Sequence, residues 1–284
     1  MMITPTAFAA THMECRNLQE SMAVMIELLA FVKVSERSGE ATLKHPNTPW
    51  LLVLHDAGPE APKKQMHNHW GVRVATTQEV DKAYEYLTAH KAEYKLGQIG
   101  KPLRNHGSYS LYFIEPGTNG WEIECYETAL RKPSSAWIGG GTRAPHWSET
   151  YPEERFPGRG YVPQGFTHGT LSAYDLKTSW DFYVKVLGLT VNQANDHVIY
   201  VKHPSTSNYV VCAERRDFKL FSPHFRNTLT VASKEDVRAA YRSFSESAKD
   251  LGIRELLALE ENDLSASFFF RDPGTNWWEI ISVN

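Results

Sequence analysis

The stretch Phe113-Ile-Glu-Pro-Gly-Thr-Asn-Gly-Trp-Glu-Ile123 occurs a second time in this chain, as Phe270-Arg-Asp-Pro-Gly-Thr-Asn-Trp-Trp-Glu-Ile280. Eight of the eleven positions are identical, and the two copies lie 157 residues apart. Solenoid arrays repeat about every 20–50 residues, whereas a period of this length is that of a whole domain. The sequence therefore predicts two similar domains.

The repeat extends beyond this phrase into the segments around it. Leu18-Gln-Glu-Ser-Met22 aligns with Leu176-Lys-Thr-Ser-Trp180, and each segment follows a strand-like run and begins an amphipathic stretch. Ser233 and Asp236 form a capping-box-like start for a further helix. The expected helices cover 18–30, 77–91, 176–187 and 233–250. Together with the strand-like runs between them, they predict four βαβββ units at about 8–60, 66–128, 165–216 and 223–284.

Length and local composition place the domain boundaries. A chain of 284 residues is long enough for two domains of ordinary size. Residues 131–164 are rich in Pro, Gly and Trp, which is typical of a linker that packs on a surface. The predicted organisation is a first domain at 1–130, this linker at 131–164, and a second domain at 165–284. Because helices and strands alternate as βαβββ, the fold class is α+β.

Charge and cysteine content exclude several classes of function. The net charge is −3 without a long basic or acidic run, so neither nucleic acid nor a membrane surface is expected as a partner. The three cysteines form no CxxC pair and are expected to be buried free thiols in a reducing compartment. The sequence shows neither a signal-peptide pattern nor a long apolar run, which indicates a cytoplasmic protein.

The two halves differ at the polar positions that are able to perform chemistry. Glu122 aligns with Glu279, but His69 aligns with Arg226, and Tyr112 and His106 align with Phe269 and Asp263. His168, near the start of the third unit, aligns with Ala10. The residue types that could bind a metal or transfer protons are therefore present around Glu122 and replaced around Glu279.

Strand geometry is consistent with a metal site formed by three of these residues. Side chains alternate between faces along a strand, so Glu122 points away from Trp121 and Ile123. A carboxylate facing inward is costly unless it meets a cation or hydrogen-bond donors. Two histidines and one carboxylate on one face are the arrangement that holds non-haem Fe(II) for O₂ chemistry. The predicted metal ligands are therefore His69, Glu122 and His168.

Two readings of the other half stay open. His12 and His224 each lie two residues from the expected ligand positions, hence on the same strand face, and with Glu279 they would form a second or alternative metal site through bulged strands. Alternatively, this cup is vestigial, and Arg226 pairs with Glu279 in place of a metal cation.

Three motifs now bring a known family into view. Thr167-His168-Gly-Thr-Leu-Ser-Ala-Tyr-Asp175 resembles a first ligand strand, and His69-Trp-Gly-Val-Arg-Val74 resembles a second. The stretch from His106 through Tyr112 to Glu122 resembles the signature of the type I extradiol ring-cleaving dioxygenases, within the vicinal oxygen chelate superfamily (the glyoxalase/bleomycin resistance/dioxygenase fold). The resemblance covers nearly the whole chain. It implies four βαβββ units paired into two cupped mixed β-sheets with helices outside, and Fe(II), or Mn(II), in one cup.

The chain departs from this family pattern in two ways. Its ligand positions are divided, with His168 in the third unit and His69 and Glu122 in the second, so units two and three must share one cup and units one and four the other. The acid/base histidine that the family carries before the last strand of the His168 unit is replaced by Asn208 and Tyr209. This departure bears on the proton-transfer step.

By resemblance, the predicted function is Fe(II)-dependent extradiol cleavage of a catechol- or hydroquinone-like ring with O₂, in the catabolism of an aromatic compound. Tyr112 is expected to donate a hydrogen bond to a substrate oxygen, and His106 to position substrate or assist proton transfer. One alternative is a metal-dependent glyoxalase-type lyase or isomerase with Glu214 as its base. Another is a non-catalytic protein that binds an aromatic compound. The expected partners are a small aromatic substrate and O₂, with a homo-oligomer also possible.

Overall fold

The computed structural model describes residues 2–61, 68–105, 107–126, 150–206, 208–215 and 220–283. The chain divides into two compact units. Met13–Gly169 is called the N-terminal unit, and Met1–His12 together with Thr170–Asn284 is called the C-terminal unit. The strands β1 (Ala7–Cys15) and β9 (Gly165–Ala173) continue from one unit into the other.

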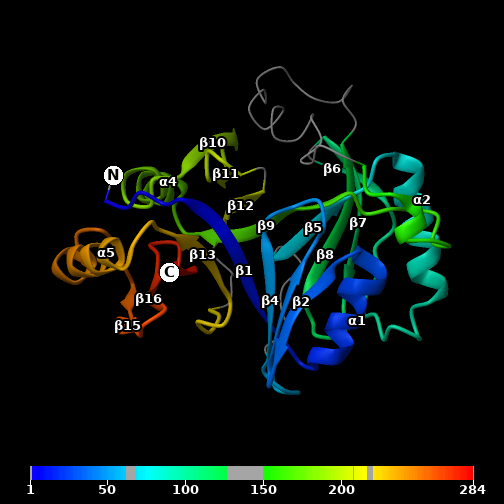
Figure 1. Ribbon diagram of the computed structural model, residues 1–284. Helices are drawn as coiled ribbons and strands as arrows, with labels where there is room; N and C mark the ends of the chain where they lie inside the picture. Colours follow the sequence, from blue (N-terminus) through cyan, green and yellow to red (C-terminus); the bar gives the residue numbers. More distant parts are fainter. Residues whose placement is uncertain are drawn as a thin grey trace. The chain divides into compact units, whose positions relative to one another are not determined.

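In the described residues, the first three repeats follow the predicted βαβββ pattern, and the fourth follows it with one extra two-residue strand, β15 (Glu260–Glu261) (Figure 1). After β1, the first repeat contains α1 (Leu18–Leu29), β2 (Val32–Arg37), β3 (Glu40–Lys44) and β4 (Leu51–Asp56). The second contains β5 (His69–Arg73), α2 (Thr77–Ala89), β6 (Leu103–Asn105), β7 (Ser108–Ile114) and β8 (Gly120–Tyr126).

The third repeat follows a short 3₁₀ helix, η3 (Glu153–Arg155), and begins with β9. It continues through α4 (Leu176–Lys185), β10 (Thr190–Asn195), β11 (Val198–Lys202) and β12 (Tyr209–Glu214). The fourth contains β13 (Arg226–Thr230), α5 (Lys234–Ser247), β14 (Glu255–Leu256), β15 (Glu260–Glu261), β16 (Ser265–Arg271) and β17 (Trp277–Val283). The prediction of an α+β fold is confirmed.

The strands form two mixed sheets. One has the order β10-β11-β12-β9-β5-β8-β7-β6, and the other has the order β14-β16-β17-β13-β1-β4-β3-β2, with β15 beside β16. The third repeat therefore continues the sheet of the second, and the fourth continues that of the first, as the divided ligand positions require.

The helices begin where side chains satisfy the free backbone N–H groups. Asn17 Oδ1 accepts from Glu20 N at 3.0 Å, and Ser233 Oγ accepts from Asp236 N at 3.1 Å. Thr76 and Glu79 form a reciprocal capping box at the start of α2. Each cap stabilises its helix by about 1 kcal/mol, so the short polar residues before each amphipathic stretch fix where these helices start.

The repeated phrase forms a tight turn around a buried carboxylate. Glu115 accepts hydrogen bonds from the backbone N–H groups of Gly117 at 2.6 Å and Asn119 at 3.0 Å, and from Ser21 Oγ at 2.7 Å. Thr118 adopts a positive φ of 75° within the turn. The second copy is built alike, with Asp272 accepting from Asn276 N at 2.8 Å and with Thr275 at φ 73°. The turn sets the start of β8 and thereby the position of Glu122.

Aromatic packing anchors β8 from its other face. Trp121 and Ile123 are fully buried, and the Trp121 ring packs against Phe31 and Phe166 at centroid distances of 5.9 and 6.0 Å. The alternation of β8 therefore directs Glu122 and Glu124 to the opposite face.

The three cysteines are free and buried, as predicted. In the part of the chain that the structure describes, no helix is long and apolar enough to cross a membrane.

Candidate metal centre

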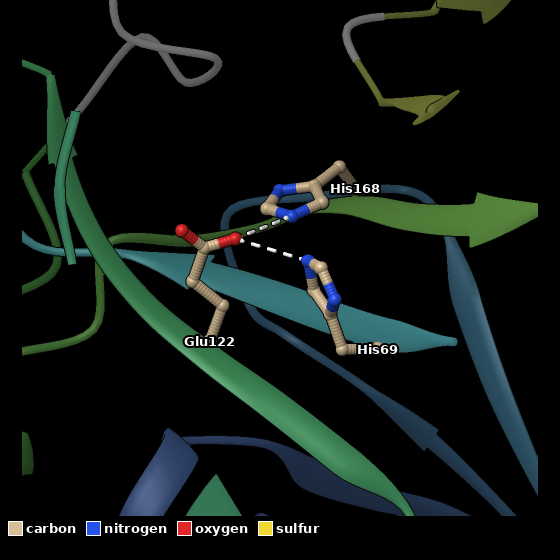
Figure 2. Close-up of side chains that lie close together, drawn as sticks. All are labelled: His69, Glu122 and His168. Atoms are coloured by element: carbon tan, nitrogen blue, oxygen red, sulfur yellow. Dashed lines mark hydrogen bonds and ion pairs between the residues drawn. The ribbon is translucent and has the colours of Figure 1, made fainter. Parts of the chain in front are cut away.

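Three side chains from three neighbouring strands meet in the N-terminal unit (Figure 2). They are the predicted ligands His69 on β5, Glu122 on β8 and His168 on β9. Glu122 Oε2 lies 3.2 Å from His69 Nε2 and 3.0 Å from His168 Nε2. Their candidate ligand atoms all lie within 4.8 Å of one another. Among the described residues, these three form a group of His, Cys, Asp or Glu side chains that are close enough together to share one metal ion.

The strand register explains why residues so far apart in sequence converge. β5 runs parallel to β8 with Gly71 opposite Glu122, and antiparallel to β9 with Gly71 opposite His168. Residues opposite each other on neighbouring strands point to the same face, as do residues two apart on one strand. Glu122, His168 and His69 therefore share a face.

Gly71 makes room for the ring of His168. A Cβ atom at this position would lie 2.0 Å from His168 Cε1 and 2.5 Å from Nδ1, well inside van der Waals contact. The imidazole thus lies directly over the backbone of β5. Only glycine permits this placement, which brings Nε2 to the Glu122 carboxylate.

Glu122 is held as a carboxylate at the centre of the cluster. Burial opposes its ionisation, but hydrogen bonds and charge from His168 and His69 outweigh burial and hold the pKa of Glu122 well below its usual value. Its second oxygen, Oε1, accepts a hydrogen bond from the Tyr112 hydroxyl at 2.8 Å. Burial and the Glu122 charge raise the Tyr112 pKa well above its ordinary value, so this phenol is a neutral donor.

Three further polar side chains lie behind His168, and the sequence analysis did not identify them. Glu124 Oε1 accepts from Arg73 Nη2 at 2.7 Å and from Thr167 Oγ1 at 3.2 Å, and lies 3.5 Å from His168 Nδ1. A signal was present, since Glu124 follows Glu122 by two residues and Arg73 follows His69 by four. Both spacings place the second residue on the same strand face as the first.

The cluster attracts a cation. Burial alone would lower the pKa of His168, but the Glu124 charge and the hydrogen bond with Glu122 raise it to about 9. Two carboxylates thus lie beside one imidazole in a buried site, and Arg73 is paired with Glu124. Two imidazoles and a carboxylate are also the donor types that divalent transition metals prefer. The residues present therefore fit a divalent metal ion.

The other predicted site residues have different outcomes. Tyr112 contacts the cluster through Glu122, and its ring meets that of His69 edge to face at a centroid distance of 5.1 Å. His106 lies outside the described residues. Glu214 belongs to the C-terminal unit, and its Oε2 lies 3.2 Å from His197 Nδ1.

The C-terminal unit contains the corresponding cluster with an arginine in it. Glu279 Oε2 accepts from Arg226 Nε at 3.0 Å and from Thr228 Oγ1 at 2.8 Å. His12 Nε2 lies 3.0 Å from Thr228 Oγ1 and 3.8 Å from Glu279 Oε2. The expected pairing of Arg226 with Glu279 is present, and His224 is exposed. A guanidinium here meets the carboxylate that a metal would otherwise meet.

Comparisons with known proteins agree with the observed fold. A family model described as "Glyoxalase/Bleomycin resistance protein/Dioxygenase superfamily" matches residues 15–125 and 165–280. Among solved structures, a Bacillus subtilis subsp. subtilis str. 168 protein described as "putative dioxygenase" is 11% identical, with a TM-score of 0.63, covering 98% of this chain and 86% of its own. Glyoxalase I from Zea mays is 13% identical with the same TM-score, covering 97% of this chain and 92% of its own. No curated protein matches the sequence. At these identities the structural likeness shows the fold alone.

Proposed function

The chain belongs to the Glyoxalase/Bleomycin resistance protein/Dioxygenase superfamily, and from this premise we propose that it is an Fe(II)-dependent extradiol dioxygenase. Members of this superfamily are mostly enzymes, and they use a divalent metal to chelate vicinal oxygens. The proposed substrate is a catechol- or hydroquinone-like aromatic compound, and the co-substrate is O₂. The proposed setting is aromatic-compound catabolism in the cytoplasm, in agreement with three free cysteines.

The observation that carries this proposal is the composition of the cluster. His69, Glu122 and His168 provide two imidazoles and one carboxylate from three adjacent strands. This set leaves coordination positions open for substrate and O₂, and it is diagnostic of non-haem Fe(II) oxygenases. Mn(II) suits the same ligands. A bound metal would supply Lewis acidity toward the substrate hydroxyls and redox chemistry toward O₂.

The chain's own residues prepare the site for that chemistry. Glu122 directs Oε2 toward both histidines while Tyr112 holds Oε1, so one carboxylate oxygen is free to bind metal. The side chains of Glu122 and His168 are 6% and 4% exposed, and that of His69 is 15% exposed. Solvent therefore reaches the cluster mainly beside His69, and substrate is proposed to enter there.

In this proposal the Tyr112 hydroxyl faces two hydrogen-bond acceptors, Glu122 Oε1 and a substrate oxygen. Its hydroxyl carries a single hydrogen, which in this structure goes to Glu122 Oε1. Donation to a substrate oxygen therefore competes with donation to Glu122, and binding of substrate would decide between them. His106 is proposed to assist proton transfer, because the family's acid/base histidine is replaced by Asn208 and Tyr209.

The glyoxalase-type alternative has less support from the site. That chemistry uses an added carboxylate base, for which Glu214 is the candidate. Glu214 lies in the C-terminal unit and forms an ion pair with the exposed His197. In the part of the chain that the structure describes, the three-residue cluster contains one carboxylate. The three-ligand cluster therefore favours the dioxygenase.

The experiment that tests the proposal is metal analysis followed by O₂ uptake. The parent protein, Glu122→Gln and Glu279→Gln are loaded anaerobically with Fe(II), and bound iron is counted. We expect one iron per chain in the parent and in Glu279→Gln, and a large loss in Glu122→Gln. Because both changes remove a buried carboxylate from equivalent positions, the second is a matched control.

The catalytic half of the test uses an oxygen electrode. The loaded parent is screened with catechols and hydroquinones, and we expect O₂ uptake with at least one of them. Iron bound without O₂ uptake across the screen would overturn the dioxygenase assignment. Iron lost only in Glu279→Gln would place the metal site in the C-terminal unit. Light scattering on the same samples measures whether the protein is a homo-oligomer.

A further inference from the structure

A chain of hydrogen bonds runs from His168 away from the cluster. Thr167 Oγ1 lies 3.2 Å from His168 Nδ1, 3.2 Å from Glu124 Oε1 and 3.1 Å from the Gly71 carbonyl oxygen. The same oxygen of Glu124 accepts from Arg73 Nη2 at 2.7 Å and Nε at 3.3 Å. Arg73, Glu124 and Thr167 are all buried, so these contacts are not shared with bulk water.

The donors and acceptors allow one assignment of the hydrogens. The Gly71 carbonyl only accepts, and so does a Glu124 carboxylate paired with Arg73. Thr167 gives its single hydrogen to one of these two oxygens, so toward His168 it accepts. His168 Nδ1 therefore carries a hydrogen, which leaves Nε2, the nitrogen 3.0 Å from the Glu122 carboxylate, as the nitrogen able to coordinate a metal.

The internal repeat provides an independent observation. At the positions that correspond to Arg73, Glu124 and Thr167, the other half has Thr230, Ile281 and Ala9. The strand register agrees, because Arg73 pairs with Glu124 between β5 and β8 as Thr230 pairs with Ile281 between β13 and β17. The hydrogen-bond chain therefore occurs in the half with the histidine cluster, and its residue types are replaced in the half where Arg226 meets Glu279.

We propose that Arg73, Glu124 and Thr167 are positioning residues that keep a hydrogen on His168 Nδ1 and hold the ring in one orientation with Nε2 toward the cluster, and thereby set the affinity of the cluster for metal. This inference rests on the proposed metal-dependent function. Partners that hydrogen-bond the second nitrogen of a ligating histidine fix its orientation and raise its basicity, and their loss weakens metal binding by about 10–100-fold.

The test uses variants that change one hydroxyl at nearly constant volume. Thr167→Val removes the acceptor for Nδ1–H, Thr167→Ser restores it, and Thr48→Val removes a buried hydroxyl that caps Phe166 N at 3.3 Å. Co(II) affinity is measured by titration of its visible absorption. Solvent exchange of the His168 Nδ1–H is read in the Zn(II)-loaded protein by ¹H–¹⁵N NMR of histidine side chains, assigned with His168→Gln. Thermal unfolding of the metal-free variants checks the fold.

We expect Thr167→Val to bind Co(II) about 10–100-fold more weakly, with faster solvent exchange of the His168 Nδ1–H. Thr167→Ser and Thr48→Val should remain within about threefold of the parent, because both keep the hydrogen-bond chain. Parent-like affinity and parent-like Nδ1–H exchange in Thr167→Val would overturn the proposal and leave the proposed function standing. Absence of Co(II) and Fe(II) binding in the parent would overturn both. Equal weakening in Thr48→Val would show a general packing effect and also overturn the proposal.

Discussion

Replacing Gly71 by alanine should disrupt the metal cluster although none of the three ligand residues is replaced. The added methyl group would lie 2.0 Å from His168 Cε1, 2.5 Å from Nδ1 and 2.7 Å from Nε2. Non-bonded carbon atoms rest at about 3.5–4.0 Å, so the ring must move by about 1.5 Å. The backbone of β5 cannot retreat instead, because it is hydrogen-bonded to β8 on one side and β9 on the other.

The size of the effect follows from this displacement. Forcing an extra methyl group into a well-packed site costs about 1–3 kcal/mol of folding stability. Metal binding should suffer more, since a shift of about 1.5 Å takes His168 Nε2 out of line with His69 and Glu122. The loss of one of three ligands is larger than the loss of an outer hydrogen-bond partner, so we expect Co(II) affinity to fall by more than about 100-fold.

The assay is a Co(II) titration of Gly71→Ala, with thermal unfolding of the metal-free protein to show that it folds. Gly100→Ala is the matched control, because a Cβ there makes ordinary contact at 3.4 Å with the Tyr112 carbonyl oxygen. It should bind Co(II) like the parent. If Gly71→Ala folds and also binds Co(II) with parent affinity, then His168 does not hold metal from this position, and the ligand set proposed here is wrong.

Two further predictions concern the N-terminal unit. Tyr112→Phe removes the donor to Glu122 Oε1 and should weaken Co(II) binding by about tenfold. Tyr109→Phe, which loses an exposed hydrogen bond to Asp81, should not weaken it, and equal affinities in the two variants would refute this prediction. Burial lowers the pKa of His45 to about 4, although Pro163 O accepts from its ring. Since the unfolded chain binds this proton near pH 6.5 and the folded chain does not, stability is lost as the pH falls toward 4. Urea unfolding should show the parent losing roughly 2 kcal/mol more than His45→Gln between pH 7 and 5, and equal losses would contradict it.

Much of the fold was predictable because the repeat carries structural residues. The repeated phrase is retained in both halves because Glu115 accepts from two backbone N–H groups, and Asp272 from one, in a turn that contains a threonine with positive φ. Such a turn places the following strand, so the repetition of the phrase predicted the repetition of the fold. The sharing of one sheet by the second and third repeats followed from the residues, since His168 has no ligand partner in its own half of the sequence.

The hydrogen-bond partners behind His168 were not predictable in the same way. Strand alternation placed Glu124 on the face of Glu122, but it did not indicate which residue of a neighbouring strand lies opposite. That information is the register, in which Arg73 is opposite Glu124 and Gly71 is opposite His168. Register depends on long-range packing and turn geometry, and it is not written in any local pattern. The role of Gly71 was hidden for the same reason.

The two clusters together suggest what the fold requires and what it leaves free. In each half, the turn and the parallel strand pair deliver one inward carboxylate, Glu122 or Glu279, into a buried place where an uncompensated negative charge is costly. In the C-terminal unit, Arg226 supplies the compensating charge permanently. In the N-terminal unit, the aligned residue is His69, whose imidazole is a ligand type for divalent transition metals. The exchange between arginine and histidine at this strand position, together with His168 on β9, thus separates a closed ion pair from a site that fits a divalent cation.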